Sequence, residues 1–175
     1  FIKRVFITPY ILGFNELYVK FEDPKDYNKI IPLLYYLPGF DIVESRKDSC
    51  LIKLVQPEIE ANFDKPYKDI LRNINEQFEM IEKYTKGEAP DLEYYDLLQE
   101  NIIRNMILAR RILNTKGLSN FKQITSKFKI LHTFEELGAY GYIFLKNCKI
   151  NTNLKKVMPE VLRLFKQYTK YIETM

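Results

Sequence analysis

The sequence contains no tryptophan, a single histidine and only two cysteines among its 175 residues. His132 cannot anchor a zinc site, because such a site needs three or four clustered Cys, His or carboxylate ligands. Cys50 and Cys148 lie about a hundred positions apart, with no metal-ligand spacing around either. We therefore expect two free, buried thiols in a reducing compartment, and hence a cytoplasmic protein.

Long apolar runs and glycine-rich motifs are also missing. No apolar stretch approaches the ~18–20 residues that a membrane-spanning helix needs, so we expect no membrane insertion. The glycines are scattered and form no phosphate-binding loop. His132, Thr133 and Cys148 fall on roughly the same predicted helix, but a single helix cannot build a catalytic triad. The sequence thus predicts a protein that is not an enzyme and has no cofactor.

Hydrophobic residues make up 46% of the chain, which is ample for a packed core. The net charge of +4 is unevenly spread, because residues 116–175 carry 11 Lys/Arg against 4 Asp/Glu. A basic C-terminal third would favour nucleic acid, acidic lipid or phosphate, whereas the simpler interpretation is a lysine-coated helical face. A nucleic-acid-binding transcriptional regulator module that uses this third is therefore an alternative function.

Residues 1–57 carry the pattern of a small α/β segment. Alternation and β-branched residues predict three strands, "ELYVKF" at 16–21, "DIVES" at 41–45 and "CLIKLV" at 50–55, the last two forming an antiparallel hairpin. A helix after the first strand begins with Asp23 as its cap and Pro24 in its first turn. We expect Pro32 to kink or split that helix. After a short helix over 2–12, the predicted order is β-α-β-β, with helices covering one sheet face.

From residue 58 to residue 175 the apolar period changes to 3.6, which predicts four long helices. Short loops favour antiparallel neighbours, so the predicted fold class is α+β, a small N-terminal segment followed by an antiparallel helical bundle. The predicted apolar stripes are Tyr67, Ile70, Ile74, Phe78 and Ile81; Leu92, Tyr95, Leu98, Ile102, Met106, Ala109 and Leu113; Phe121, Ile124, Phe128, Leu131, Glu135, Ala139 and Tyr142; and Val157, Val161, Leu164, Phe165 and Tyr168.

Glu135 stands in the third stripe, where an apolar residue is expected. It is a metal ligand, a member of a buried hydrogen-bond network, or a tolerated edge residue. Pairing with Glu100 in the manner of a di-iron bundle would also need Glu-x-x-His motifs, which are missing. Gly138 and Gly141 each weaken the helix by about 1 kcal/mol relative to alanine, a cost tolerated more easily where a neighbouring helix approaches closely.

Two sets of polar residues on the second long helix are candidate binding groups. Asn101 and Asn105 are spaced i,i+4, so they either hydrogen-bond across a helix interface or form a polar flank. Arg104, Arg110 and Arg111 are expected to be solvated helix charges, and the sharper alternative is that one of them pairs with Glu135. We take these three arginines as candidates for contact with a partner or with phosphate.

The order of several soft motifs resembles a known family. These are "YILGFNELYVKF" at 10–21, "LPGFDIVESRKDSCLIKLVQP" at 37–57, a helix starting near Phe63, "LQENIIRNMILARRIL" at 98–113 and "FEELGAYGYI" at 134–143. Together they resemble the phosphate-uptake regulators of the PhoU type over residues 3–148. The likeness is greatest to the archaeal branch, in which an AbrB-like DNA-binding hairpin precedes a small α/β segment and a three-helix PhoU domain.

The resemblance implies a metal-binding motif that this chain has largely lost. In the family, paired motifs of an acidic residue, three others and an Asp bind metal ions. The matching positions are Asn101 and Asn105 on one helix, and Glu135 and Ala139 on the next. Because hard cations prefer several anionic oxygens, one Glu with two amides would bind them weakly, and we expect no bound metal.

The resemblance also implies a role in regulating phosphate uptake through protein partners, such as a phosphate transporter or a signalling component. The chain begins at Phe1 without an initiator Met, so we expect a fragment whose preceding AbrB-like part carries any contact with DNA. We further expect a homodimer. Tyr168 and Tyr171 on the last helix either cover the bundle or form a dimer seam.

Overall fold

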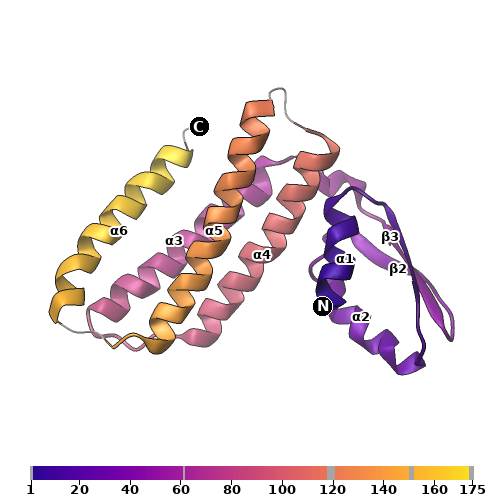
Figure 1. The fold of residues 1–175 in the computed structure, drawn as a ribbon, viewed down its shortest axis with the longest axis horizontal. Coiled ribbons are helices and arrows are strands. Elements are labelled where there is room, and N and C mark those ends of the chain that lie inside the picture. The colour runs from indigo at the N-terminus through magenta and orange to yellow at the C-terminus, as the bar shows by residue number, and fades with distance from the viewer. Residues whose placement is uncertain (1, 61, 118–120, 150–151, 174–175) are drawn as a thin grey trace. The chain divides into compact units, whose positions relative to one another are not determined.

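The computed structural model describes residues 2–60, 62–117, 121–149 and 152–173 and confirms the α+β fold class, a small helix-and-sheet segment followed by four long packed helices (Figure 1). The elements in chain order are α1 (Ile2–Ile11), β1 (Glu16–Lys20), the 3-10 turn η1 (Pro24–Asp26), α2 (Tyr27–Leu34), β2 (Phe40–Ser45), β3 (Ser49–Leu54), the 3-10 turn η2 (Pro57–Glu60), α3 (Asp64–Thr85), α4 (Leu92–Thr115), α5 (Phe121–Asn147) and α6 (Thr152–Glu173).

The chain divides into two compact units. Unit 1 contains Phe1–Tyr67 and Ile103–Phe128, and unit 2 contains Lys68–Ile102 and Lys129–Met175. The division falls inside α3, α4 and α5, so each of these helices contributes to both units. The two units therefore differ from the predicted ranges 1–57 and 58–175, chiefly because the second half of α4 groups with the N-terminal segment.

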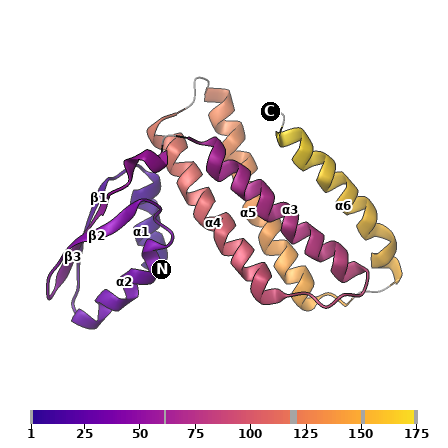
Figure 2. The ribbon, with the colours of Figure 1, turned by 180° about the vertical axis from the view of Figure 1, so that it is seen from behind.

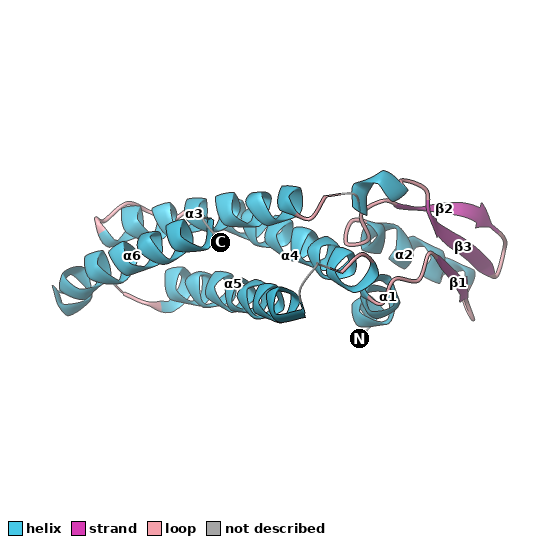
Figure 3. Ribbon diagram, turned by 90° about the horizontal axis from the view of Figure 1, so that it is seen from above, coloured by secondary structure: helices cyan, strands magenta, loops and turns pink. Residues whose placement is uncertain are grey.

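The sheet of unit 1 has three antiparallel strands in the order β1-β3-β2 (Figure 3). The predicted β2–β3 hairpin is confirmed, and a bulge between Ile42 and Glu44 interrupts its register. On β1 and β3 the paired residues Glu16 and Lys53 form an ion pair at 2.8 Å. Strand β3 lies in the middle, so both neighbouring strands depend on it for their backbone hydrogen bonds.

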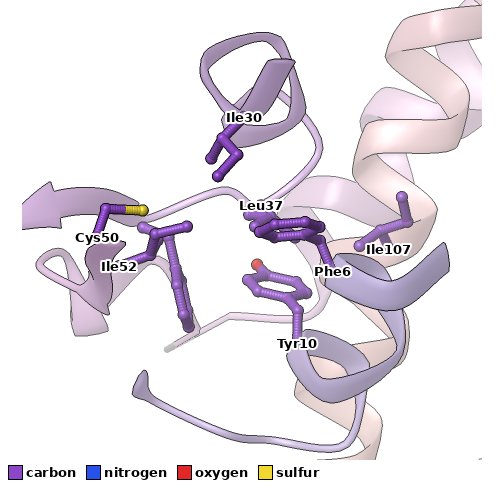
Figure 4. Packing of buried hydrophobic residues seen from close by; sticks show 8 residues of the cluster. Phe6, Tyr10, Ile30, Leu37, Cys50, Ile52 and Ile107 are labelled. Carbon is purple, nitrogen blue, oxygen red and sulfur yellow. The ribbon is translucent and has the colours of Figure 1, made fainter. Parts of the chain in front are cut away.

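Helices α1 and α2 cover one face of this sheet (Figure 2). Figure 4 shows Phe6 and Tyr10 of α1 pointing toward the side chains of Leu37, Ile52 and Cys50. The α4 residue Ile107 belongs to the same buried cluster, which also includes Ile30 and Phe40. Because a two-stranded hairpin is at best marginally stable alone, the third strand and the apolar surface of these helices stabilise the sheet.

The predicted Asp23 cap forms on the 3-10 turn η1, which leads directly into α2. The Asp23 side chain accepts a hydrogen bond from the Lys25 backbone N–H at 2.9 Å, and Pro24 occupies the first turn. Pro32 does not split the helix, because α2 continues through it to Leu34. A proline removes one backbone hydrogen bond, and here the helix ends within two residues of that loss.

The apolar stripes of the first two long helices are confirmed. The residues predicted for α3 are all buried, and those for α4 are buried from Tyr95 to Leu113, with Leu92 half-buried. Among the described residues no helix is long and apolar enough to cross a membrane. The prediction for the thiols is only half right, because Cys50 is buried whereas Cys148 is exposed.

The predicted stripe of α5 is displaced from the buried one. Ala139 is exposed, and Glu135 and Tyr142 are only half-buried. The buried row is instead Leu131, Phe134, Gly138, Gly141 and Leu145, and the side chain of Phe121 lies outside the described residues. Glu135 therefore lies beside the buried apolar row and not within it, so no carboxylate interrupts that row.

Gly138 and Gly141 belong to this buried row because α4 approaches α5 closely there. A methyl group added to Gly138 would overlap the side-chain oxygen of Gln99, and one added to Gly141 would overlap the Tyr95 hydroxyl. The Tyr95 hydroxyl donates a hydrogen bond to the Gly138 carbonyl at 3.0 Å. The predicted close approach of a neighbouring helix is therefore confirmed.

Helix α6 packs through a different row from the one predicted. Val157, Val161, Leu164 and Tyr168 are exposed, whereas Phe165 is buried. The buried row of α6 is Leu162, Phe165, Thr169 and Ile172. The Phe165 ring stacks on Phe78 of α3 with centroids 3.5 Å apart, which joins α6 to the bundle.

A charged contact also joins α3 to α6. Lys166 Nζ lies 2.8 Å from Glu82 Oε2, and Lys86 Nζ lies 2.9 Å from Glu82 Oε1. These two hydrogen bonds lower the pKa of Glu82 to about 2. Glu82 is therefore charged over the whole physiological range, and its carboxylate holds two cations.

We predict that Gly141→Ala destabilises the chain by about 1–2 kcal/mol, because the methyl group overlaps Tyr95 by more than the helix propensity of alanine can offset. Urea unfolding measures the change. Adding Tyr95→Phe removes the overlapping hydroxyl, so Gly141→Ala should cost less in that background. The exposed Ala139→Gly is the control and should lose about 1 kcal/mol from propensity alone. A Gly141→Ala variant as stable as the wild type would contradict the close approach.

We predict that the stabilisation from Glu82 depends on pH. Its folded pKa lies below the unfolded value of about 4.3, so the stabilisation is present at neutral pH and is lost as the pH falls toward 2. Glu82→Gln should cost less than about 1 kcal/mol at pH 7, because the group is near the surface, and nothing near pH 2. Urea titrations of both proteins at several pH values measure the difference, and a constant difference would contradict this assignment.

Candidate functional site

Arg111 of α4 is completely buried, with 0% of its surface exposed. It lies in a stretch of α4 in which Met106, Ile107, Leu108, Ala109, Ile112 and Leu113 are also buried. A guanidinium in such surroundings must have its charge and its donors satisfied, because an unpaired buried charge costs several kcal/mol. The expectation that Arg111 is a solvated helix charge is therefore wrong.

The N-terminal segment supplies the partners of Arg111. Its Nε donates to Glu60 Oε1 at 2.5 Å, and its Nη2 donates to Asn15 Oδ1 at 2.6 Å. Its Nη1 donates to the backbone carbonyls of Tyr10 at 2.7 Å and Phe14 at 2.8 Å. Four of the five guanidinium donors are thus engaged within unit 1. The ionic partner of Arg111 is therefore Glu60.

The same contacts cap the C-terminus of α1. A helix leaves its last four carbonyls without intrahelical partners. Here the Tyr10 carbonyl accepts a hydrogen bond from Arg111, and the Ile11 carbonyl accepts one from the Asn114 side-chain amide at 2.8 Å. A cation at this end also complements the helix dipole. Gly13 turns the chain with a φ of 93°, a conformation that favours glycine, and so brings the Phe14 carbonyl back toward Arg111.

Two aromatic rings complete the surroundings of Arg111. The guanidinium carbon lies 4.7 Å from the Tyr10 ring centroid and 5.2 Å from that of Phe40, within the range of cation–π attraction. The Tyr10 hydroxyl donates to the Pro38 carbonyl at 2.9 Å. Burial raises the pKa of Tyr10 far above its ordinary value, so this phenol stays neutral.

A second buried polar cluster lies in unit 2. The Gln77 side-chain amide of α3 donates to Gln99 Oε1 of α4 at 3.0 Å, next to the glycine face of α5. Burial raises the pKa of Tyr95 far above its ordinary value, as it does for Tyr10. These groups are neutral hydrogen-bonding partners, and a general base or nucleophile would need a pKa closer to neutrality.

Thiol chemistry is disfavoured for Cys50. This thiol is buried, and burial raises its pKa, whereas a reactive cysteine needs a lowered pKa that favours the thiolate. Arg111, Glu60, Tyr10, Tyr95 and Cys50 are thus buried titratable groups that hold the fold together or stay neutral within it.

The four positions of the degenerate motif lie on α4 and α5. Asn101, Glu135 and Ala139 belong to unit 2, whereas Asn105 belongs to unit 1. Ala139 is exposed, and the other three are half-buried. Within the described residues, no three His, Cys, Asp or Glu side chains come together in a group that could hold a metal ion.

Arg104 differs from Arg111 in lying near the surface of unit 1. Its Nε donates to the Tyr35 carbonyl at 3.0 Å, and its guanidinium carbon lies 5.3 Å from the Tyr35 ring centroid. The ring of Tyr36 stands edge-on to that of Tyr35, and Lys3 Nζ lies 3.3 Å from its centroid. Half-buried Arg104 and Lys3 therefore flank a pair of tyrosines, which combines positive charge with aromatic rings near the surface of unit 1. Arg110, the third candidate arginine, is half-buried.

Several cations of the basic C-terminal third already have partners within the protein. Arg163 lies 2.6 Å from Glu160, and Lys166 is held by Glu82. Lys127 lies 4.6 Å from the Phe63 ring centroid. The two ion pairs offset part of the positive charge that this third would present to a phosphate backbone.

The chain matches no protein-family model, no curated protein and no solved structure.

Sequence reasoning missed Glu60, Asn15 and the burial of Arg111. Asn15 and Glu60 lie in connecting segments, where nothing in the local pattern shows which polar residue will be covered. One signal was available for Arg111. Six of the eight residues from Met106 to Leu113 are apolar and lie on several sides of the helix, which favours burial of most of this stretch. This pattern favours burial of one of its two arginines but does not show which one, and the structure buries Arg111 and leaves Arg110 half-buried.

We predict that Arg111→Met lowers the free energy of unfolding by about 3–5 kcal/mol, because it leaves the Glu60 carboxylate buried without its cation. Combining it with Glu60→Gln should recover part of the loss. The exposed Arg163→Met removes an ion pair of similar length at the surface and should cost no more than about 1 kcal/mol. Urea unfolding followed by circular dichroism measures all three. If Arg111→Met costs as little as Arg163→Met, the assigned role of Arg111 is incorrect.

Proposed function

We propose that the chain is a non-enzymatic regulator of phosphate uptake or phosphate signalling that acts through a protein partner. The observation that carries the proposal is that the buried titratable groups described above are either paired with each other or kept neutral. Arg111 and Glu60 satisfy each other, while Tyr10, Tyr95 and Cys50 are held neutral by burial. Because these buried groups stabilise the fold, we infer that the protein acts by binding a partner through its surface.

The order of the segments supports the phosphate part of the proposal. The β-α-β-β segment and the long helices occur in the order from which the PhoU-type resemblance was inferred. Position 135 is the single remaining acidic position of the motif, so a regulatory role here would not depend on a bound metal cluster. Arg104, beside Tyr35, is the candidate for contact with the partner, because arginine and tyrosine are enriched at binding hot spots.

The test is phosphate uptake in cells that lack the parent gene. With labelled phosphate in phosphate-rich medium, we expect uptake to rise several-fold, because the regulator restrains import. The wild-type gene should restore restraint. Arg104→Ala should restore less of it, whereas the exposed Arg163→Ala, on another helix, is the matched control and should behave as the wild type. Unchanged uptake after deletion would contradict the proposal.

A second variant separates binding from metal-dependent chemistry. Glu135→Gln removes the last carboxylate of the degenerate motif and should restore uptake control fully. The purified chain should carry less than stoichiometric metal by elemental analysis. Loss of control in a Glu135→Gln protein that still folds would favour a metal-dependent activity and would contradict the non-enzymatic role.

A further inference from the structure

Helix α6 has two neighbouring apolar rows, and only one of them is buried. The inner row packs on the bundle through Leu162, Phe165 and Ile172. The outer α6 row consists of Val157, Val161, Leu164, Tyr168 and Tyr171, with exposed fractions between 40% and 65%. An exposed apolar row of this length marks an interaction surface more often than a surface without function.

The spacing of the outer α6 row fits a helical occupant. Its residues follow one another at intervals of 4, 3, 4 and 3, which are the a and d positions of a heptad repeat. Half-buried Leu154 continues the pattern toward the N-terminus. Two helices with such rows pack by placing each side chain in a hole of the other.

The residues at the edges of the row indicate what kind of helix fits. On the solvent side the neighbouring positions are Glu160 and Gln167, and on the other side Phe165 turns into the bundle. The basic residues Lys156 and Arg163 lie one step farther from the row. An acidic partner helix would select cations at these edge positions, and Glu160 and Gln167 do not provide them.

We propose that the outer α6 row binds the same row of a second copy of this chain, with the two helices antiparallel. In this register Val157 of one copy faces Tyr168 of the other, and Val161 faces Leu164. A small residue thus meets a large one in each layer, and Glu160 meets the neutral Gln167. A parallel pair would place Tyr168 against Tyr168 and Val157 against Val157, which fills the seam unevenly.

The available area fits a dimer of moderate strength. Five side chains that are about half-exposed present on the order of 500 Å² in each copy, or about 1,000 Å² in total, which is near the lower limit for a specific interface. We therefore expect dissociation in the micromolar range. This inference concerns self-association and does not rest on the proposed regulatory role.

Sedimentation velocity of the full chain between 1 and 100 μM tests the proposal. The wild type should shift from monomer toward dimer across this range. Leu164→Glu places a charge in the centre of the seam and should weaken association at least tenfold. Lys155→Gln changes the charge by the same amount on the opposite side of α6 and should associate as the wild type. Circular dichroism melts check that all three proteins fold.

Cross-linking tests the direction of the helices, with exposed Cys148 replaced by serine in each protein. Val157→Cys and Tyr168→Cys proteins should form a disulfide dimer when mixed, and neither should do so alone. Cross-linking of Val157→Cys to itself would overturn the antiparallel register. A monomeric wild type, or a dimer unaffected by Leu164→Glu, would overturn the interface. Binding of the monomer to vesicles of anionic lipid, lost in Leu164→Glu, would assign the row to a membrane surface instead.

Discussion

The buried charge of Arg111 is the constraint on which unit 1 depends. A guanidinium without solvent must find its partners inside the protein, and its four contacts come from the end of α1, the turn after it and the segment before α3. None of these partners is near Arg111 in sequence. Arg111 therefore ties α1, the turn after it and Glu60 to the second half of α4, beside the apolar contacts of Ile107, and these contacts are consistent with the grouping of this half with the N-terminal segment.

This arrangement also bears on function. Buried ionisable residues are often catalytic candidates, because low dielectric shifts their pKa toward the values that chemistry needs. Here the guanidinium and the Glu60 carboxylate neutralise each other, and burial moves the pKa values of Tyr10 and Tyr95 away from the useful range. These buried groups contribute to the architecture of the fold, and both of our proposals concern the surfaces of α4 and α6.

Local patterns predicted most elements, because the residues that form a strand or cap a helix are close together in the sequence. The β2–β3 hairpin, the Asp23 cap and the stripe from Tyr67 to Ile81 were all visible in this way. The packing faces of α5 and α6 were not. Gly138 and Gly141 belong to a buried face only because Gln99 and Tyr95 approach them, and α6 offers two apolar rows with nothing local to choose between them. The degenerate metal motif likewise depends on which residues meet in space.

The central claim is that Arg111 makes the sheet and the second half of α4 a single cooperative unit. Native-state hydrogen exchange tests this most directly, because segments that open together share one opening free energy. The account predicts that the amides of β3 and of residues 103–115 exchange with a common free energy in the wild type. Protected amides in residues 103–115 while β3 opens separately, at a much lower free energy, would contradict it.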